Sequence, residues 1–408
     1  MKAEKELAEV YAAAYRALES HDYEAARIAA GKLAARAPVE AAGLSCAIGI
    51  EAGEAEAAEA AWEKLAALAP QDVYTKFLAA RIAFLREDYA RARDILLPIR
   101  AEKANDDYQE RIWNLYGQCA RILGDPKEAG RAYLHAARAA TSLAFAATEY
   151  SDYLFNLHYL PTSLAEQRRA AEGYGRLFHG LPQFFHAYPK EKEKLRIGYI
   201  SGDLRNHVVL RFVYAFFSHW DKEKFEVYAY ANNEEDACSR HLQKRVTAWR
   251  NILGLPAEQA ARQIYEDRID ILVDFSGHTK DNCLPVLAYR PAPVQISGIG
   301  YFASTGLPTV DYFLSDTTLA AGEAERAFTE ELLVLPASHF CYTPLEDPAF
   351  FPAAPSAKKG YITFGSFNNF AKVNEEVLGA WREILARVPD SRLFLKTDAF
   401  DAPASREA

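Results

Sequence analysis

The sequence predicts a helical-repeat arm followed by an α/β region built on a mostly parallel sheet. In the first 140 residues a short motif with an acidic first residue occurs four times, at intervals of 32, 34 and 37 residues. From residue 195 onward, short apolar runs alternate with helix-forming segments, which is the pattern of a parallel sheet covered by helices. Most of these apolar runs end in polar or glycine-containing loops, so we expect a ligand crevice at the carboxyl ends of the strands.

Length, charge and cysteine content exclude several classes of protein. The chain has 408 residues, half of them hydrophobic, and a net charge of -9, so we expect two or three domains with real cores and no nucleic-acid partner. The charged start M-K-A-E-K-E-L-A-E-V is unlike a signal peptide, and no run of 18 apolar residues occurs. We therefore expect a cytoplasmic protein without a membrane partner. The five cysteines are scattered and indicate reduced thiols rather than a metal site.

The repeated motif predicts pairs of helices. Its copies are D-Y-E-A-A-R at Asp22, E-A-E-A-A-E at Glu54, D-Y-A-R-A-R at Asp88 and D-P-K-E-A-G-R-A-Y at Asp125. In each copy the acidic residue can cap a helix and the small residues let a partner helix approach closely. The period is close to the roughly 34 residues of tetratricopeptide repeats, which this arm resembles. A non-repeating all-helical domain is the alternative.

Such an arm predicts a protein partner. Stacked repeats expose a concave groove that holds an extended peptide or another protein, and self-association through the repeats is a second possibility. We expect the prolines of Ala37-Pro38, Ala69-Pro70 and Leu97-Pro98 to end helices. Beyond the arm, Pro161 is expected to open a helix over Ser163 to Leu177 that joins the arm to the next lobe.

Strands and helices alternate between residues 195 and 345. The stretch L-R-I-G-Y-I-S-G-D-L-R-N-H, residues 195–207, contains a buried strand that leads into a polar turn. A helix is expected over Pro256 to Arg268. Further strands are expected at Phe225 to Tyr230, Ile269 to Phe275, Val294 to Ile299, Tyr312 to Leu314 and Leu332 to Leu335.

The loops after these strands define the candidate site. They read S-G-D-L-R-N-H at 201–207, S-G-H-T-K at 276–280, G-I-G-Y-F-A-S-T-G at 298–306 and S-D-T at 315–317. Since carboxyl ends of parallel strands share one edge, we expect these loops to converge. The region contains no P-loop, no G-x-G-x-x-G after the first strand and no D-x-D pair. A phosphate in this site would therefore be neutralised by cations, backbone N–H groups and a helix N-terminus.

The last 60 residues predict the beginning of a second lobe. After a proline-rich linker from Pro344 to Pro355, the pattern predicts one β-α-β unit with strands at Tyr361 to Phe367 and Arg392 to Lys396. Between them we expect a helix over Asn374 to Val388 with Trp381 on its core side. The predicted domains are the repeats at 1–150, a helical connector at 151–194, a Rossmann-like lobe at 195–345, and a linker with a partial lobe at 346–408.

Several ordered motifs resemble one family. In addition to residues 195–207, these are K-F-E-V-Y-A-Y, D-I-L-V-D-F-S-G-H-T, Y-R-P-A-P-V-Q-I-S-G-I-G-Y-F-A-S-T-G-L-P-T-V-D-Y-F-L-S-D and F-N-N-F-A-K-V-N, and L-F-N-L-H-Y precedes them. Together with the repeat arm, they resemble the O-linked N-acetylglucosamine transferase family, including its SPINDLY-type members. The resemblance implies a GT-B fold, with two Rossmann-like lobes around a sugar nucleotide, and inverting transfer of a sugar to Ser or Thr of a protein.

The resemblance also implies roles for individual residues. His207 matches the family's active-site histidine, and Lys372 matches a lysine that contacts the donor diphosphate. The alternatives are a histidine that only ties its loop to Asp203 and a lysine that is merely exposed. Phe302 stands where many members have proline. The residues expected to bind donor or acceptor are Asp203, Gly277, His278, Thr279, Gly300, Tyr301, Thr305, Gly306 and Asn369.

These observations predict an inverting protein O-glycosyltransferase that uses UDP-N-acetylglucosamine and needs no metal or other cofactor. UDP-glucose and GDP-fucose remain open as donors. Because the family continues beyond the last strand, the resemblance implies an incomplete or degenerate donor lobe and weak donor binding. A non-catalytic tetratricopeptide adaptor is therefore the main alternative, and another sugar-nucleotide enzyme such as an epimerase is a weaker one.

Overall fold

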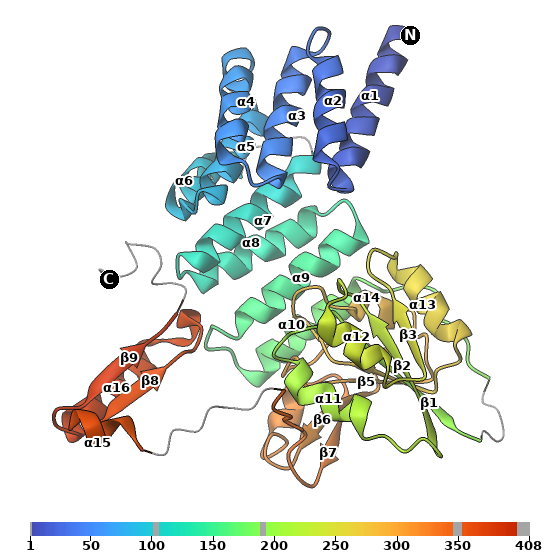
Figure 1. The fold of residues 1–408 in the computed structure, drawn as a ribbon, viewed down its shortest axis with the longest axis vertical. Helices are drawn as coiled ribbons and strands as arrows, with labels where there is room; N and C mark the ends of the chain where they lie inside the picture. Colours follow the sequence, from blue (N-terminus) through green and yellow to red (C-terminus); the bar gives the residue numbers. More distant parts are fainter. Residues whose placement is uncertain (1, 101–105, 188–192, 346–352, 398–408) are drawn as a thin grey trace. The chain divides into compact units, whose positions relative to one another are not determined.

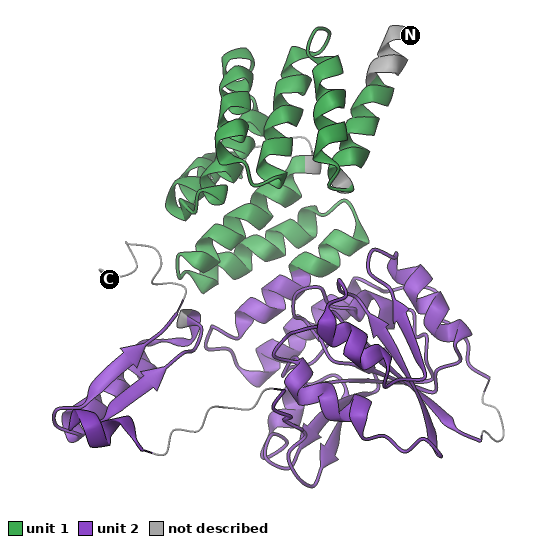
Figure 2. Ribbon diagram, in the orientation of Figure 1, with its two compact units in different colours: residues 1–149 green, residues 150–408 purple. Residues whose placement is uncertain are grey.

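The computed structural model describes residues 2–100, 106–187, 193–345 and 353–397 (Figure 1). The chain forms two compact units, Met1–Glu149 and Tyr150–Ala408 (Figure 2). The first unit is entirely helical, whereas the second contains every strand among the described residues. This is the predicted combination of a helical arm with an α/β region. The finer division into four domains stays a prediction.

The first unit is a row of antiparallel helix pairs. Each helix packs chiefly on the next along the chain, as in tetratricopeptide repeats. The helices are α1 (Lys2–Glu19), α2 (Tyr23–Leu33), α3 (Pro38–Glu51), α4 (Ala55–Leu68), α5 (Val73–Leu85), α6 (Tyr89–Ile99), α7 (Asp106–Ile122) and α8 (Pro126–Ala139), and α9 (Leu143–Leu157) crosses into the second unit.

The repeated acidic residues open the second helix of each pair, as the sequence predicts. The side chains of Asp22, Asp88 and Asp125 each accept a hydrogen bond from the backbone N–H three residues further on, at 3.0 to 3.1 Å. These bonds satisfy N–H groups that the helix leaves unpaired. Glu54 stands at the equivalent place before α4 but makes no capping bond. Its carboxylate pairs with Arg27 of the preceding repeat instead.

Two of the three prolines do not end helices, so that prediction was wrong for them. Pro38 is the first residue of α3, where its missing N–H costs nothing because that group has no partner within a helix. Pro98 lies inside the last turn of α6, one residue before the helix ends. Only Pro70 follows a helix end.

The second unit is built on a seven-stranded parallel sheet in the order β3-β2-β1-β4-β5-β6-β7. Tyr199 of β1 lies opposite Ala229 of β2 and Val273 of β4, so β1 is central. The strands are β1 (Leu195–Ser201), β2 (Phe225–Ala231), β3 (Ala248–Asn251), β4 (Ile271–Asp274), β5 (Val294–Ser297), β6 (Tyr312–Asp316) and β7 (Glu331–Leu335). The sequence analysis missed β3, because A-W-R-N contains no apolar run.

The strand order reverses between β1 and β4, as in doubly wound sheets. In the described part of the chain, the helical elements that precede or connect the strands of this sheet are α10 (Leu164–Arg176), α11 (Leu210–Ser218), α12 (Ala237–Gln243), α13 (Ala257–Glu266), the short α14 (Leu284–Leu287) and the 3-10 turn η1 (Ala324–Ala327). Ser163, rather than Pro161, opens α10, and it forms a capping box with Glu166. That bond pair fixes the start of α10 at Leu164, one residue after the predicted start at Ser163.

The C-terminal segment forms the predicted β-α-β unit with its own two-stranded parallel sheet. It contains α15 (Pro355–Lys359), β8 (Thr363–Ser366), the 3-10 turn η2 (Phe370–Lys372), α16 (Glu375–Arg387) and β9 (Arg392–Leu395). Trp381 lines an apolar pocket with Phe364 and Leu393, so it faces the strands as expected. Most of the predicted linker, at 346–352, lies outside the described residues.

In the described ranges, none of the helices combines the length and the apolar character needed to cross a membrane.

Two glycines of the arm give a test of its packing. A methyl group on Gly49 of α3 would lie 2.8 Å from the backbone nitrogen of Ala58 in α4, whereas nothing lies within 4 Å of one on Gly31 of α2. Alanine favours a helix over glycine by about 1 kcal/mol. We expect Gly31→Ala to stabilise the arm by up to that amount and Gly49→Ala to destabilise it.

Amide hydrogen exchange of α2, α3 and α4 in the full chain measures both effects. Equal protection of α3 and α4 in the two variants would contradict the close contact of α3 with α4.

Candidate active site

Three of the predicted loops meet where the strand order reverses. They follow β1, β4 and β5, which are neighbours in the sheet, and therefore leave it at the same edge. The hydroxyls of Ser201 and Ser276 lie 3.0 Å apart, and the Gly202 N–H donates to Ser276 Oγ at 3.3 Å. The loop after β1 is thus bonded to the loop after β4 at the place where doubly wound sheets bind ligands.

The loop after β1 presents an imidazole held by a carboxylate. Nδ1 of His207 lies 3.3 Å from Oδ1 of Asp203, and the backbone N–H of Val209 donates to the same Nδ1 at 3.4 Å. The Asp203 side chain is 9% exposed, whereas that of His207 is 39% exposed. Within the described part of the chain, Nε2 of His207 has no hydrogen-bond partner. This nitrogen is therefore available to a ligand.

Burial raises the pKa of the Asp203 carboxyl, while the neighbouring His207 and Arg205 lower that pKa. In the tautomer with its proton on Nδ1, the imidazole donates to this carboxylate and Nε2 is a hydrogen-bond acceptor, whereas in the other tautomer Nδ1 accepts from the N–H of Val209. The pair therefore has the arrangement of a general base with its orienting carboxylate.

His278 is enclosed by the protein in this structure, and its role as a binding residue stays a prediction. Its side chain is fully enclosed, with 1% of the residue exposed. Nε2 donates to the carbonyl of Thr305 at 3.0 Å, and Nδ1 accepts from the hydroxyl of Ser151 in α9 at 2.9 Å. Both ring nitrogens are thus used within the protein. Burial lowers the pKa of His278 to about 3, so the ring is neutral and joins three segments.

A buried carboxylate shapes the same loop. Asp274, at the end of β4, accepts from the N–H groups of Ser276 and Gly277 at 3.0 and 2.8 Å and from the Ser297 hydroxyl at 2.7 Å. Burial raises the pKa of Asp274, and these three bonds lower it. Thr279 also closes the turn, because its hydroxyl donates to the carbonyl of Ser276 at 2.9 Å. Gly277 and Thr279 therefore serve the shape of the loop.

Tyr301 and Thr305 are likewise held by the protein. The hydroxyl of Tyr301 lies 2.8 Å from Nε2 of His158, which belongs to the L-F-N-L-H-Y motif, and only 5% of Tyr301 is exposed. The backbone N–H of Thr305 donates to the buried Glu330 carboxylate at 2.7 Å, and its hydroxyl donates to the same oxygen. Neither side chain is open to a ligand in this structure.

The glycines of the third loop allow it to pack on its neighbours. A methyl group on Gly306 would lie 1.9 Å from the carbonyl oxygen of Ala171 in α10, and Gly306 has a φ of +71°. A methyl group on Gly300 would lie 2.0 Å from the carbonyl oxygen of Phe275. Both contacts require glycine. These glycines therefore allow close packing within the protein, and their contact with donor or acceptor stays a prediction.

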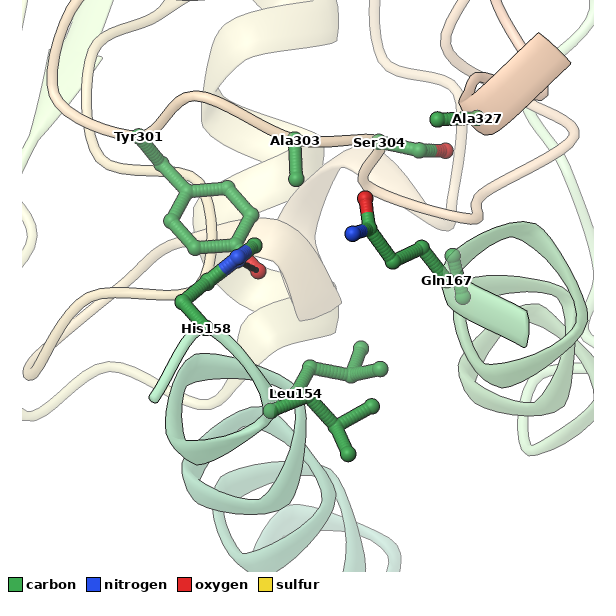
Figure 3. Close-up of a pocket in the computed structure, with 9 residues that line it drawn as sticks. Leu154, His158, Gln167, Tyr301, Ala303, Ser304 and Ala327 are labelled. Atoms are coloured by element: carbon green, nitrogen blue, oxygen red, sulfur yellow. Dashed lines mark hydrogen bonds between the residues drawn. The ribbon is translucent and has the colours of Figure 1, made fainter. Parts of the chain in front are cut away.

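The pocket beside Tyr301 is too small for a sugar nucleotide. Figure 3 shows His158 next to the ring of Tyr301, with Gln167 directed toward Ser304. Leucines 154 and 157 close its helical side. The free volume is about 10 Å³, which is room for about one water molecule. We therefore place the candidate site at the open Asp203–His207 pair rather than in this pocket.

Lys372 and Asn369 lie in the C-terminal β-α-β unit. Lys372 ends the turn η2 and is exposed. Asn369 opens the same turn, because its side chain accepts from the N–H of Ala371 at 3.0 Å and its carbonyl accepts from the N–H of Lys372 at 3.0 Å. Their approach to His207 stays a prediction. No group of three or more metal-ligating side chains occurs among the described residues.

The sequence analysis missed four residues that hold the loops in place, namely Ser151, His158, Asp274 and Glu330. His158 and Asp274 stand in motifs that the sequence analysis quoted, L-F-N-L-H-Y and D-I-L-V-D-F-S-G-H-T. Ser151 and Glu330 had no such signal, since their partners lie 127 and 25 residues away.

Protonation of His278 gives a test of its burial. The ordinary pKa of a histidine is about 6.5, so between this pH and about 3 the unfolded chain binds a proton that the folded chain does not. Stability is therefore lost as the pH falls below 6.5, by up to about 1.4 kcal/mol per pH unit. We expect His278→Gln, whose amide can still donate to Thr305, to reduce this dependence.

Chemical denaturation of the full chain between pH 7 and 5 measures the slope, with the exposed His219→Gln as the matched control. The same slope in wild type and His278→Gln would show that His278 is not held neutral.

Comparison with known proteins agrees with this geometry. Residues 176–344 match the family described as Glycosyl transferase family 41. The SPINDLY protein of Solanum lycopersicum, named a probable UDP-N-acetylglucosamine–peptide N-acetylglucosaminyltransferase, is 37% identical over 246 residues, which are 58% of this chain and 26% of that protein. The corresponding Arabidopsis thaliana protein is 40% identical over 53% of this chain and 24% of its own length.

A second Arabidopsis thaliana relative, SEC, carries the same description and is 29% identical over 53% of this chain and 24% of its own length. The chain thus spans about a quarter of the length of these relatives. The structure of a mutant O-GlcNAc transferase from Thermobaculum terrenum superposes with a TM-score of 0.69 and 24% identity, over all of this chain and 71% of the other. That likeness confirms the fold, a repeat arm followed by a GT-B region.

Residues 176–344, which contain the sheet and the loops at its reversal, therefore match glycosyl transferase family 41, and this part of the chain is similar to the O-linked N-acetylglucosamine transferases and their SPINDLY-type members.

Proposed function

We propose that this chain carries the acceptor-side lobe of an inverting protein O-glycosyltransferase. The reaction is the transfer of N-acetylglucosamine from UDP-N-acetylglucosamine to a Ser or Thr hydroxyl of a protein. The observation that carries this proposal is the pair of buried Asp203 and half-exposed His207 at the reversal of the sheet, in a segment that matches family 41. The printed names of the relatives support the same donor and a peptide acceptor.

His207 acts as the general base in this proposal. Asp203 holds the proton on Nδ1, so Nε2 accepts the proton of the acceptor hydroxyl as its oxygen attacks C1 of the sugar. The bond from C1 to the diphosphate oxygen breaks on the opposite face, which inverts the configuration. The products are the glycosylated side chain, UDP and a protonated imidazole that returns its proton to water.

Lys372 stabilises the leaving diphosphate in this scheme. Negative charge grows on the phosphate oxygens as the C1–O bond breaks, and an ammonium group offsets it. Lys372 is exposed on a short turn whose N–H groups Asn369 organises. We infer that ammonium and backbone N–H groups serve in place of a metal ion, so transfer is expected to continue in the presence of a chelator.

The arm supplies the acceptor protein in this proposal. Stacked helix pairs offer a concave surface for an extended segment, and binding there holds a hydroxyl near the reacting carbon, which is an orientation effect. Self-association through the same helices and a cytoplasmic location belong to the proposal as well.

A non-catalytic adaptor is the second candidate. The observation that favours it is that the arm forms a compact unit of its own, so it can bind partners independently of transfer. Sugar added to co-expressed proteins, read by mass spectrometry, separates the adaptor from the enzyme.

Removal of the imidazole tests the base. We expect His207→Ala to lower the transfer rate by about 10² to 10⁴, the usual contribution of general base catalysis, because the acceptor hydroxyl loses its proton acceptor. Asp203→Asn should lower it as well, since an amide cannot hold the same tautomer. The exposed His219→Ala is the matched control. Single-turnover transfer measures these rates, and an unchanged rate in His207→Ala would contradict the proposed role.

Replacement of Lys372 tests the contact with the donor. We expect Lys372→Met to weaken UDP binding and to lower kcat, because the diphosphate loses a positive charge, without changing the KM for the acceptor. Lys358→Met, an exposed lysine of α15 in the same unit, serves as the matched control. Calorimetric titration with UDP and steady-state kinetics measure the two effects. Equal behaviour of the two variants would remove Lys372 from the site.

A further inference from the structure

A second aspartate–histidine pair lies at the same edge of the sheet. Asp316 is the last residue of β6, and His339 follows the end of β7 by four residues. The two strands are neighbours in the sheet (Figure 1). Nδ1 of His339 lies 2.7 Å from Oδ2 of Asp316, and the His339 N–H donates to the same oxygen at 3.1 Å. The N–H groups of Thr318 and Leu319 donate to Oδ1 at 2.9 and 3.0 Å. The first two bonds tie residue 339 to the end of β6, and the other two hold the Asp316 carboxylate in place.

The second pair differs from the first in its burial. The His339 side chain is 1% exposed, against 39% for His207. A carboxylate can only accept, so Nδ1 carries a proton, and the second ring nitrogen is Nε2. In the described structure this nitrogen is buried and has no hydrogen-bond partner. An enclosed imidazole cannot contact a substrate directly. The role of His339 therefore lies in its hydrogen bond to Asp316.

That bond holds the segment that follows β7. We call residues 336–345 the strap. The ring of Phe340 lies 5.0 Å from that of Phe212 in α11, and the ring of Tyr342 lies 5.4 Å from the same ring. The N–H of Thr343 donates to the carbonyl of Arg211 at 2.7 Å. The strap is therefore anchored to β6 at one point and to the first turn of α11 at three others.

The first turn of α11 in turn holds His207. The N–H of Leu210 donates to the carbonyl of His207 at 3.1 Å, and the N–H of Val209 lies 3.4 Å from its ring Nδ1. A continuous series of contacts thus runs from Asp316 through His339, the strap and α11 to the imidazole of the candidate base. Packed side chains and hydrogen bonds of this kind transmit small displacements.

We propose that His339 is a positioning residue, which fixes the imidazole of His207 by anchoring the strap to β6 and to α11. The activity part of this inference rests on the proposed function, whereas the positioning itself does not. Asp316 would keep three backbone donors without the ring. One of these three donors is the backbone N–H of His339 itself, and the ring adds a second, shorter bond from the same residue to Oδ2. The ring bond also lowers the pKa of Asp316 far below the usual range.

Three variants separate the ring bond from simple filling of space. His339→Leu removes the donor but keeps an apolar side chain, and Asp316→Asn leaves one acceptor oxygen for the donors that two oxygens share in the wild type, with almost no change of volume. His339→Asn places an amide N–H close to the position of Nδ1 and should restore the bond. Cys341→Ser, an exposed position of the strap, is the matched control.

Hydrogen exchange of residues 203–212 in the full chain is the first measurement. We expect exchange about tenfold faster in His339→Leu and Asp316→Asn than in wild type, with the arm unchanged. His339→Asn and Cys341→Ser should remain within about twofold of wild type. Unchanged exchange of residues 203–212 in both His339→Leu and Asp316→Asn would overturn the inference, as would faster exchange of every segment alike. If His339→Leu fails to fold, Asp316→Asn and the rescue by His339→Asn decide the matter.

Steady-state transfer is the second measurement. We expect kcat to fall about tenfold or more in His339→Leu and Asp316→Asn, because a small misplacement of a catalytic group is costly, while the KM for the donor stays unchanged. A loss expressed only in the donor KM would overturn the inference. If no form of the chain transfers sugar but exchange at 203–212 responds as expected, the proposed function fails and the positioning role stands.

Discussion

A buried, neutral imidazole holds the candidate site together. His278 receives a hydrogen bond from Ser151 of α9 and gives one to Thr305 of the loop after β5, while its own backbone belongs to the loop after β4. The rings of Tyr174 and Tyr301 meet it edge-on at 4.5 and 5.3 Å. Since burial disfavours the charged form, this ring works as a fixed donor and acceptor. Ser151 of α9 and Tyr174 of α10 are thereby part of the unit that carries the site.

Two aspartate–histidine pairs occur on one edge of the sheet, and burial gives them different roles. In the first pair, Nε2 of His207 is open to a ligand, whereas both side chains of the second pair, Asp316 and His339, are enclosed. The chemistry of the side chains is the same in both. The exposed pair can exchange a proton with a substrate, and the enclosed pair can only fix the backbone that it joins. The likeness to glycosyltransferases of family 41 bears on the first pair, in the loop after β1.

The repeat arm follows the same principle of local bonds supported by close packing. Aspartates at the start of α2, α6 and α8 satisfy the free N–H groups of those helices, and small residues such as Gly49 let neighbouring helices touch. In the α/β unit, Gly300 and Gly306 do the same for loops. A glycine in a motif thus indicates a close approach, but the sequence does not say whether a ligand or the protein itself approaches.

The sequence by itself determined the arm, the parallel sheet, most of its strands and the convergence of the loops, because capping residues, apolar runs and strand ends are local features. It also gave His207 and Asp203 as neighbours, since they lie four residues apart in one turn. Only the tertiary structure decided that His278, Tyr301 and Thr305 face inward, and that Ser151, Glu330 and the pair of Asp316 with His339 hold the loops. The physical reason is that burial and long-range hydrogen bonds depend on partners up to 127 residues away, which no local pattern records.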